Sequence, residues 1–158
     1  MARKTLLHFL GEFMTVAEIM TTEVITANMD DTLGGIRKVF ELNHFHHIPI
    51  FEGNRLAGIV SDRDVLKNLS SRADAGNANN HALNTLSKKM HQIMTRKVIT
   101  INPEDTIEEA AVTMLEKKFN CLPVLEPSGA IVGIVTKTDL LRSLVVLPVG
   151  QLSSQKSK

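Results

Sequence analysis

The stretch that decides the fold occurs twice in the chain. Residues 19–26 read IMTTEVIT, and residues 93–100 read IMTRKVIT, 74 positions later. Residues 58–64, GIVSDRD, likewise recur as residues 133–139, GIVTKTD, after one inserted residue. Self-similarity at a long fixed period is typical of duplicated supersecondary units, so we interpret the chain as two copies of one unit.

The repeat divides the chain into five parts. We place the first unit at residues 15–70 and the second at residues 88–146. Residues 71–87 between them are rich in turn formers and predict a linker, and residues 147–158 form a polar tail. Residues 1–14 are an amphipathic segment for packing on the body or on a second subunit, with apolar side chains at helical spacing: Leu6, Phe9, Leu10 and Phe13.

Within each copy, hydrophobic periodicity and turn residues predict the order of the elements. A β-prone run at residues 24–26 or 98–101 is followed by a helix, a hairpin of two strands, and a last helix that begins at Ser61 or Thr136. The expected fold class is α/β of the α+β type, with two β-α-β-β-α units. The apolar faces of the first helices are Leu33, Ile36, Val39 and Phe40 in one copy and Ile107, Ala110, Ala111 and Met114 in the other.

Further local expectations concern the helices. We expect Asp105 to cap the first helix of the second copy, with Glu108 three residues on. Gly34 and Gly35 should loosen the matching helix of the first copy by about 1 kcal/mol per glycine. The last helices are expected to turn two apolar pairs inward, Val65 with Leu66 and Leu140 with Leu141.

Composition excludes several classes of function. The 18 Lys and Arg residues against 17 Asp and Glu residues leave a net charge of +1, so no general basic surface exists to bind nucleic acid. No stretch approaches the ~18 apolar residues that cross a bilayer, so a membrane partner is not expected. Cys121 is the only cysteine, which excludes an intrachain disulfide and suits a reducing compartment. We therefore expect a cytoplasmic protein.

The repeated motif at residues 58–64 and 133–139 contains the groups that are expected to bind a ligand. Its glycine is expected to let a ligand approach closely, and Ser61 or Thr136 caps a helix whose N–H groups can bind an anion. Asp64 or Asp139 offers acceptor oxygens to a diol. Together these groups match the two ends of a ribose phosphate. The alternative stays open, because Ser-x-x-Asp is also an ordinary capping box that stabilises a helix without any ligand.

The Ile-Met-Thr start, the apolar-Pro-apolar strand and the Gly-x-x-(Ser/Thr)-x-x-Asp close, all duplicated, resemble a pair of cystathionine-β-synthase (CBS) domains. The chain is similar to small free-standing bacterial CBS-pair proteins, including those like the acetoin-utilisation regulator. The resemblance implies two units packed by pseudo-twofold symmetry, with clefts for AMP, ADP, ATP or S-adenosylmethionine as regulatory ligands and no required cofactor. It also implies a homodimer and a non-catalytic module whose output reaches an unidentified effector protein.

The resemblance also assigns roles by position. It implies that Asp64 and Asp139 bind ribose hydroxyls and that Ser61 and Thr136 lie near phosphate. The adenine would lie near the residues that lead into the proline strands: His46, His47 and Ile48 in one copy, and Asn120, Cys121 and Leu122 in the other. Thr26 and Thr100, which end the first strands, are further candidates.

Two departures concern the shape and charge of the clefts. Family members often have glycine where Phe45 and Phe119 stand here, and this bulk would narrow the adenine slot. Asp62 in the first copy aligns with Lys137 in the second, so phosphate tails should favour the Thr136 end unless Arg63 turns inward to offset Asp62.

The sequence contains weaker signals for a metal site and for an enzyme. The histidines at positions 44, 46 and 47 suggest a metal site, but the second copy lacks them and we expect no metal. A catalytic site would need a nucleophile with a positioned base or paired carboxylates in one cleft, and the sequence specifies neither. A dimerisation or partner-binding module with unoccupied clefts remains the alternative to a ligand sensor.

Overall fold

The computed structural model describes residues 14–70 and 83–145. In chain order, the first repeat forms η1 (Val16–Glu18), β1 (Ala27–Asn28), α2 (Leu33–Leu42), β2 (His47–Glu52), β3 (Arg55–Ser61) and α3 (Asp62–Ser70). The second repeat forms α5 (Met90–Ile93), α6 (Ile107–Lys117), β4 (Cys121–Leu125), β5 (Ile131–Thr136) and α7 (Lys137–Leu144). The predicted fold class, two units of mixed helix and strand, is confirmed.

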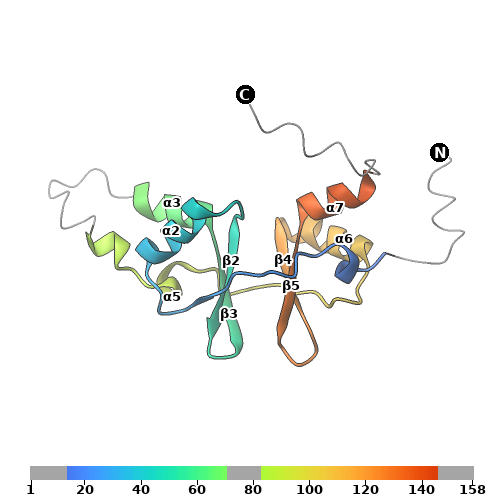
Figure 1. Ribbon diagram of the computed structural model, residues 1–158, viewed down its shortest axis with the longest axis horizontal. Helices are drawn as coiled ribbons and strands as arrows, with labels where there is room; N and C mark the ends of the chain where they lie inside the picture. The colour runs from blue at the N-terminus through green and yellow to red at the C-terminus, as the bar shows by residue number, and fades with distance from the viewer. Residues whose placement is uncertain (1–13, 71–82, 146–158) are drawn as a thin grey trace, which may run out of the picture.

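Two halves lie side by side, with the hairpins β2–β3 and β4–β5 in the middle and the helices α2, α3, α6 and α7 above and outside them (Figure 1). The first half contains the three-stranded sheet β1-β2-β3, and the second half contains the two-stranded sheet β4-β5. Both predicted hairpins are present, with His47 opposite Ser61 in one and Cys121 opposite Thr136 in the other. Gly53 turns the first hairpin at a φ of 57°, in the left-handed region that favours glycine.

Each half is completed by the start of the other repeat. The core of the first half includes Met90 and Met94 from α5 and the residue that follows it. The core of the second half includes Val16 from η1, with Ile19 and Met20 packed against it. The sequence repeat therefore exchanges its first segment between the two halves, so neither core is made from one repeat alone.

The motif glycines serve this exchange. A Cβ on Gly58 would lie 2.5 Å from Sδ of Met94 and 3.0 Å from the carbonyl oxygen of Thr95. A Cβ on Gly133 would meet Sδ of Met20 in the same way. The expectation that these glycines make room for a ligand was wrong, because the methionine of the opposite repeat fills the space that each missing side chain leaves.

The predicted first strands were placed too early in each repeat. Residues 24–26 form no strand, and β1 begins at Ala27, which pairs in parallel with Ile50. Residues 98–100 also form no strand, and Ile101 makes only an isolated bridge to Val124. Thr21 still pairs with the second half, so the residues after it must cross to the first half and have no ladder partner on the way.

The helix caps differ from the prediction in one position. Thr106, not Asp105, caps α6, and its side chain accepts a hydrogen bond from the N–H of Glu109 at 3.2 Å. Asp105 instead accepts the N–H of Asn102 at 2.8 Å, in the turn before the helix. The predicted cap and the observed cap differ by one residue because both positions carry a side chain that can cap a helix.

The apolar faces of α2 and α6 are confirmed in outline, since Leu33, Ile36, Ala110 and Met114 are buried. The inward pairs of the last helices were half wrong. Val65 is buried, but Leu66 is 62% exposed and Leu141 is 63% exposed. Consecutive residues of a helix point about 100° apart, so the second residue of each pair, Leu66 or Leu141, faces outward when the first faces the core.

Three expectations lie outside the described residues. These are the amphipathic stripe from Leu6 to Phe13, the greater part of the linker and the polar tail. Among the described helices, none is long and apolar enough to cross a bilayer.

Candidate functional site

Two cavities lie where the halves meet, and at least one capping motif lines each of them. Cleft 1 has a volume of about 160 Å³ and contains Ser61 and Asp64 from the end of β3 and the start of α3. Cleft 2 has a volume of about 920 Å³; it contains Thr136 and Asp139 and extends across to Ser61 and Asp64. Ligand pockets usually measure about 300–1,000 Å³, so cleft 2 falls within this range and cleft 1 falls below it.

The opposite wall of each cleft comes from the other repeat. Ile59 and Thr95 form an antiparallel bridge, with N–H to oxygen distances of 3.0 and 2.9 Å, which carries residues 97–99 along cleft 1. Thr21 and Ile134 form the equivalent bridge, with both distances 2.9 Å, beside cleft 2. Glu23, Val24 and Ile25 follow it along the cavity. Each cleft thus pairs a polar cap from one repeat with an apolar segment from the other.

Both motifs form complete capping boxes. In cleft 1, Oδ2 of Asp64 accepts the N–H of Ser61 at 2.9 Å and its hydroxyl at 2.7 Å. In cleft 2, Oδ2 of Asp139 accepts the N–H of Thr136 at 2.8 Å and its hydroxyl at 2.6 Å. The capping interpretation is therefore correct for both, and it uses one oxygen of each carboxylate. The other oxygen of Asp139 lies 3.6 Å from a guanidinium nitrogen of Arg142.

A side-chain contact between Asp62 and His46, which the sequence analysis missed, lies at the start of α3. Oδ2 of Asp62 is 2.7 Å from Nδ1 of His46, and Oδ1 of Asp62 accepts the N–H of Arg63 at 2.7 Å. The N–H of Asp62 also donates to the carbonyl of His46 at 3.1 Å. The second repeat keeps that backbone bond, from Lys137 to Asn120 at 3.0 Å, but has Asn120 and Lys137 in place of His46 and Asp62. The sequence offered one signal for this contact: Asp62 aligns with Lys137 of the second repeat, and histidines stand nearby at positions 44, 46 and 47.

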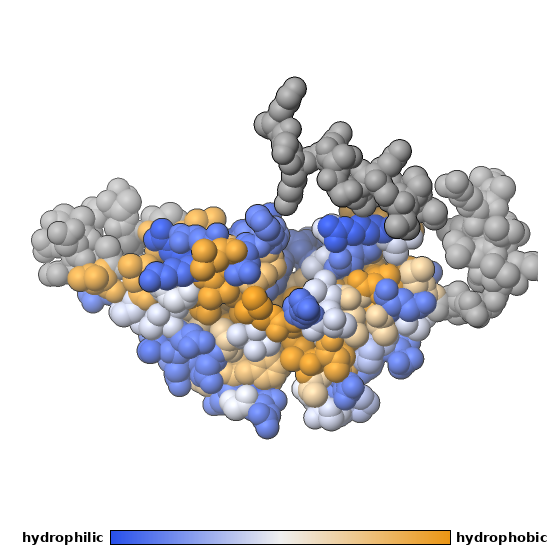
Figure 2. Space-filling view, in the orientation of Figure 1, coloured by the Kyte–Doolittle hydropathy of each residue, from blue (hydrophilic) through white to orange (hydrophobic). Residues whose placement is uncertain are grey.

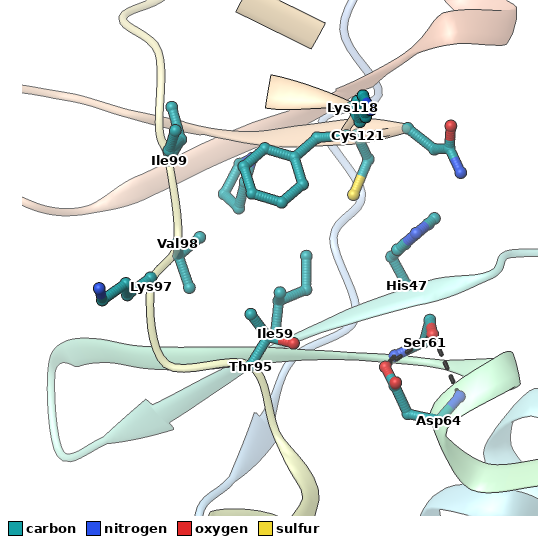
Figure 3. Close-up of a pocket in the computed structure, with 13 residues that line it drawn as sticks. His47, Ile59, Ser61, Asp64, Thr95, Lys97, Val98, Ile99, Lys118 and Cys121 are labelled. Atoms are coloured by element: carbon teal, nitrogen blue, oxygen red, sulfur yellow. Dashed lines mark hydrogen bonds between the residues drawn. The ribbon is translucent and has the colours of Figure 1, made fainter. Parts of the chain in front are cut away.

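Burial changes the ionisation of two residues that line the clefts. Burial lowers the pKa of His47, although the nearby carboxylate of Asp62 opposes that shift. Burial raises the pKa of the Cys121 thiol to about 12, so this side chain stays neutral and unreactive at neutral pH. The thiol, the pocket residues around it and the capping bonds of Ser61 are visible in Figure 3.

The structure brings most of the candidate site residues to the clefts. His47, Ser61, Asp64 and Asn120 line both cavities, and Cys121 lines cleft 1. The candidates that line cleft 2 alone are His46, Arg63, Thr136, Lys137 and Asp139.

Four candidates lie elsewhere. Ile48 and Leu122 are fully buried in the two hydrophobic cores, because alternate residues of a strand point to opposite faces. Thr26 and Thr100 are exposed and line neither cleft. Val24 and Ile25, and Val98 and Ile99 in the other repeat, line the cavities in their place.

The walls also carry charged residues that the sequence analysis did not select. Lys97 and Lys118 line cleft 1, where Asp64 is the acidic residue. Glu23 and Arg142 line cleft 2. Phe119 and Phe45 line clefts 1 and 2 respectively, at the positions where bulk was expected to narrow the adenine slot. Among residues 14–70 and 83–145, no group of three or more His, Cys, Asp or Glu side chains could hold a metal ion.

Comparison with known proteins identifies a family and several structural neighbours. A family model described as CBS domain matches the chain at residues 16–71 and again at residues 90–146. The CBS domain pair of protein MJ0100, solved with 5′-methylthioadenosine and S-adenosyl-L-methionine, is 28% identical. The match covers 84% of this chain and 97% of that one, with a TM-score of 0.69.

Two further structures are similar. The crystal structure of CBSX2 in complex with AMP is 25% identical and covers 83% of this chain and 96% of that one, with a TM-score of 0.68. A Vibrio cholerae protein described as AcuB, an acetoin utilization protein, is 27% identical. That match covers 84% of this chain and 91% of the other, with a TM-score of 0.69.

Proposed function

The chain belongs to the CBS-domain family, and on that premise we propose that it is a non-catalytic regulatory module that binds an adenosyl ligand in clefts 1 and 2. One observation carries the proposal: in each cleft, a carboxylate-bearing helix cap faces an apolar segment from the other repeat. A polar end beside an apolar slot suits a nucleoside, which has a hydroxyl-bearing sugar and a flat apolar base.

The two neighbours solved with adenosyl compounds support this ligand class. One complex contains S-adenosyl-L-methionine and 5′-methylthioadenosine, and the other contains AMP. For the present chain we propose AMP, ADP, ATP or S-adenosylmethionine as the regulatory ligand. We place the activity in the cytoplasm, in keeping with a single cysteine held as a thiol.

We assign roles to the cleft residues as follows. Oδ1 of Asp64 or Asp139 accepts hydrogen bonds from ribose hydroxyls, while Oδ2 remains in the helix cap. The tail of the ligand lies toward Ser61 or Thr136 and the N-terminus of the adjoining helix. Cleft 2 is the principal site, because its volume of about 920 Å³ accommodates a nucleotide.

A ligand in either cleft would contact residues of both repeats. A ligand in cleft 2 touches the cap at Thr136 and the apolar segment at Val24 and Ile25, which come from different repeats. Such a ligand favours one arrangement of the halves only if it binds that arrangement more tightly than the other. We propose that this preference changes the association of the protein with a separate effector.

A homodimer is part of the proposal. Large apolar side chains are exposed on the four outer helices: Leu42, Leu66, Val112, Leu115, Leu141 and Leu144. Figure 2 shows hydrophobic side chains among polar ones over α2 and α3. Side chains of this kind support a partner surface. Light scattering at micromolar concentration should give the mass of a dimer, and the mass of a monomer would contradict the proposal.

These exposed side chains also favour the alternative function, a dimerisation module whose clefts hold no ligand. An enzyme is less well supported, because the hydroxyl of Ser61 donates to Asp64 and not to a histidine base. A thermal-shift panel of AMP, ADP, ATP and S-adenosylmethionine separates the sensor from the alternative. A ligand at ~100 times its Kd should stabilise the protein by about 2.7 kcal/mol. Failure of all four compounds to shift the transition would contradict the sensor function, and release of product from ATP would indicate an enzyme.

A further inference from the structure

His47 occupies the wall that the two clefts share. This shared wall is defined by the four residues that line both cavities: His47, Ser61, Asp64 and Asn120. His47 is the first residue of β2 and lies opposite Ser61 in the hairpin. Figure 3 shows the imidazole of His47 and the thiol of Cys121 both projecting into the cavity. Among the four wall residues, only a histidine ordinarily changes charge near neutral pH.

At the position equivalent to His47, the second repeat has no group that titrates near neutral pH. Cys121 stands at the position that matches His47, opposite Thr136 in the second hairpin. Because burial raises the pKa of Cys121 to about 12, this thiol carries no charge at neutral pH. Asn120, which precedes it on the shared wall, has no ionisable group. At this position the side chain of the first repeat, His47, can therefore take up a proton, and the equivalent side chain of the second repeat cannot.

Charged groups face His47 from each element around it. Burial lowers the pKa of His47, the carboxylates of Asp62 and Asp64 oppose this shift, and His46 and Arg63 add to it. The other titratable or charged side chains of the clefts are Lys97 and Lys118 in cleft 1 and Glu23, His44, Lys137, Asp139 and Arg142 in cleft 2. With its pKa below the ordinary value of 6.5, His47 is mainly neutral at pH 7 in the free protein.

We propose that His47 determines which adenosyl ligand the clefts select, by taking up a proton when a ligand with an anionic tail reaches the shared wall. The inference rests on the proposed function, in which the ligand tail lies toward Ser61, the residue opposite His47; it places the tail, and not the adenine, beside His47. A phosphate beside the ring stabilises the imidazolium, whereas the sulfonium of S-adenosylmethionine repels it and adenosine has no tail charge. A phosphorylated ligand is thus favoured over a cationic one, and increasingly so as the pH falls.

The direction of the pH effect follows from linkage. The phosphate raises the pKa of His47 in the complex above its value in the free protein. Affinity for the phosphorylated ligand therefore rises as the pH falls through the pKa of the complex, and it levels off below the pKa of the free protein. Between these two values, one bound proton changes the affinity by up to about tenfold per pH unit.

Calorimetry of the full chain with AMP tests this. Titrations at pH 7 in buffers of different ionisation enthalpy give the number of protons taken up, and the comparison of wild type with His47→Asn cancels the titration of the ligand's own phosphate. We expect wild type to take up several tenths of a proton more than His47→Asn, and its affinity for AMP to rise about tenfold between pH 8 and pH 6 after correction by the variant. Adenosine should show no such uptake. His91→Asn, which changes a histidine that lines neither cleft, should behave as wild type.

A second measurement does not depend on a variant that folds. The imidazole resonances of His47 in the wild-type protein should titrate at higher pH with saturating AMP than without it. Equal proton uptake by wild type and His47→Asn, or an unchanged titration of His47 with AMP bound, would overturn the inference and leave the proposed function intact. Failure of AMP to bind at any pH would overturn both.

Discussion

Clefts 1 and 2 have matching helix caps and different walls. Ser61 with Asp64 and Thr136 with Asp139 make the same set of hydrogen bonds to within 0.1 Å. Across from the caps, cleft 1 has Lys97, Lys118 and Cys121, and the corresponding residues beside cleft 2 are Glu23, His44 and His47. The duplicated motif has kept its local structure, while the surfaces that meet a ligand have diverged.

This difference shows how an interlocked duplication can specialise. Because each cleft takes its cap from one repeat and its opposite wall from the other, different substitutions within one repeat can alter the two clefts separately. Lys137 changes the cap end of cleft 2, while Lys97 of the same repeat changes the far wall of cleft 1. The predicted preference of phosphate for the Thr136 end therefore depends on Lys137 outweighing Lys97 and Lys118.

The largest expected effect concerns the contacts that join the halves, which are alike on both sides. Met94→Ala should destabilise the protein by about 2–5 kcal/mol through loss of a buried side chain, and Gly58→Ala should cost about 1–3 kcal/mol by overpacking against Met94. The double variant should cost less than the sum, because the smaller side chain at position 94 makes room for the new methyl group. Denaturant unfolding measures all three. Strict additivity would show that Gly58 and Met94 do not share that space.

The next effect should separate the clefts. Asp139→Asn should weaken AMP binding by about 1.5–3 kcal/mol, or roughly ten- to a hundredfold, by weakening an acceptor for the ribose. Asp64→Asn is the matched variant; because Asp64 lines both clefts, it should weaken binding in cleft 1 and affect cleft 2 less than Asp139→Asn does. Two-site calorimetry with AMP and 2′-deoxy-AMP reports each loss and its dependence on the ribose hydroxyl. Wild-type affinity in both variants would show that the two carboxylates act only as helix caps.

A smaller effect should expose the charge difference between the caps. Lys137→Ala should weaken ATP by about 1.5 kcal/mol, roughly tenfold, because its ammonium contacts the phosphates, and should leave adenosine nearly unchanged. Asp62→Ala should tighten ATP binding less than the removal of a carboxylate without a partner would, since Asp62 already contacts His46 at 2.7 Å. Lys118→Ala is the corresponding variant for cleft 1, because Lys118 is a lysine that lines that cleft. Equal losses of ATP and adenosine on removing Lys137 would contradict the predicted asymmetry.

The smallest effect distinguishes the first helices of the two halves. The N–H and hydroxyl of Thr106 hydrogen-bond the carboxylate of Glu109 and lower its pKa below 4.5, whereas the matching position in α2 is Gly35. A lowered pKa means that Glu109 contributes stability above pH 4.5, and that this contribution is lost as the pH falls through the pKa of the folded state.

Unfolding experiments at a series of pH values measure this contribution. Glu109→Gln should flatten the loss of stability between about pH 5 and pH 3 relative to wild type, because the carboxyl that gains a proton on acidification is gone. Glu108→Gln, one position earlier, is the matched control and should keep the wild-type slope. An unchanged slope in Glu109→Gln would show that the Thr106 cap does not depend on the ionised carboxylate.

The sequence by itself determined the duplication, the class of fold, the two hairpins and the two capped helices that carry Asp64 and Asp139. These features depend on side-chain period, turn residues and hydrogen bonds between neighbours, all of which are local. Capping remained open to a functional or a purely structural interpretation, because the same Ser-x-x-Asp spacing satisfies both.

Only the tertiary structure decided which segments meet across the two halves. The period of a repeat reports that Met20 and Met94 are equivalent, but not that each packs against the motif glycine of the opposite repeat. In the same way, the outward turn of Leu66, the pairing of His46 with Asp62 and the position of His47 between two clefts arise from contacts between residues distant in sequence. Such contacts are set by the packing of whole helices and strands, which local sequence patterns do not determine.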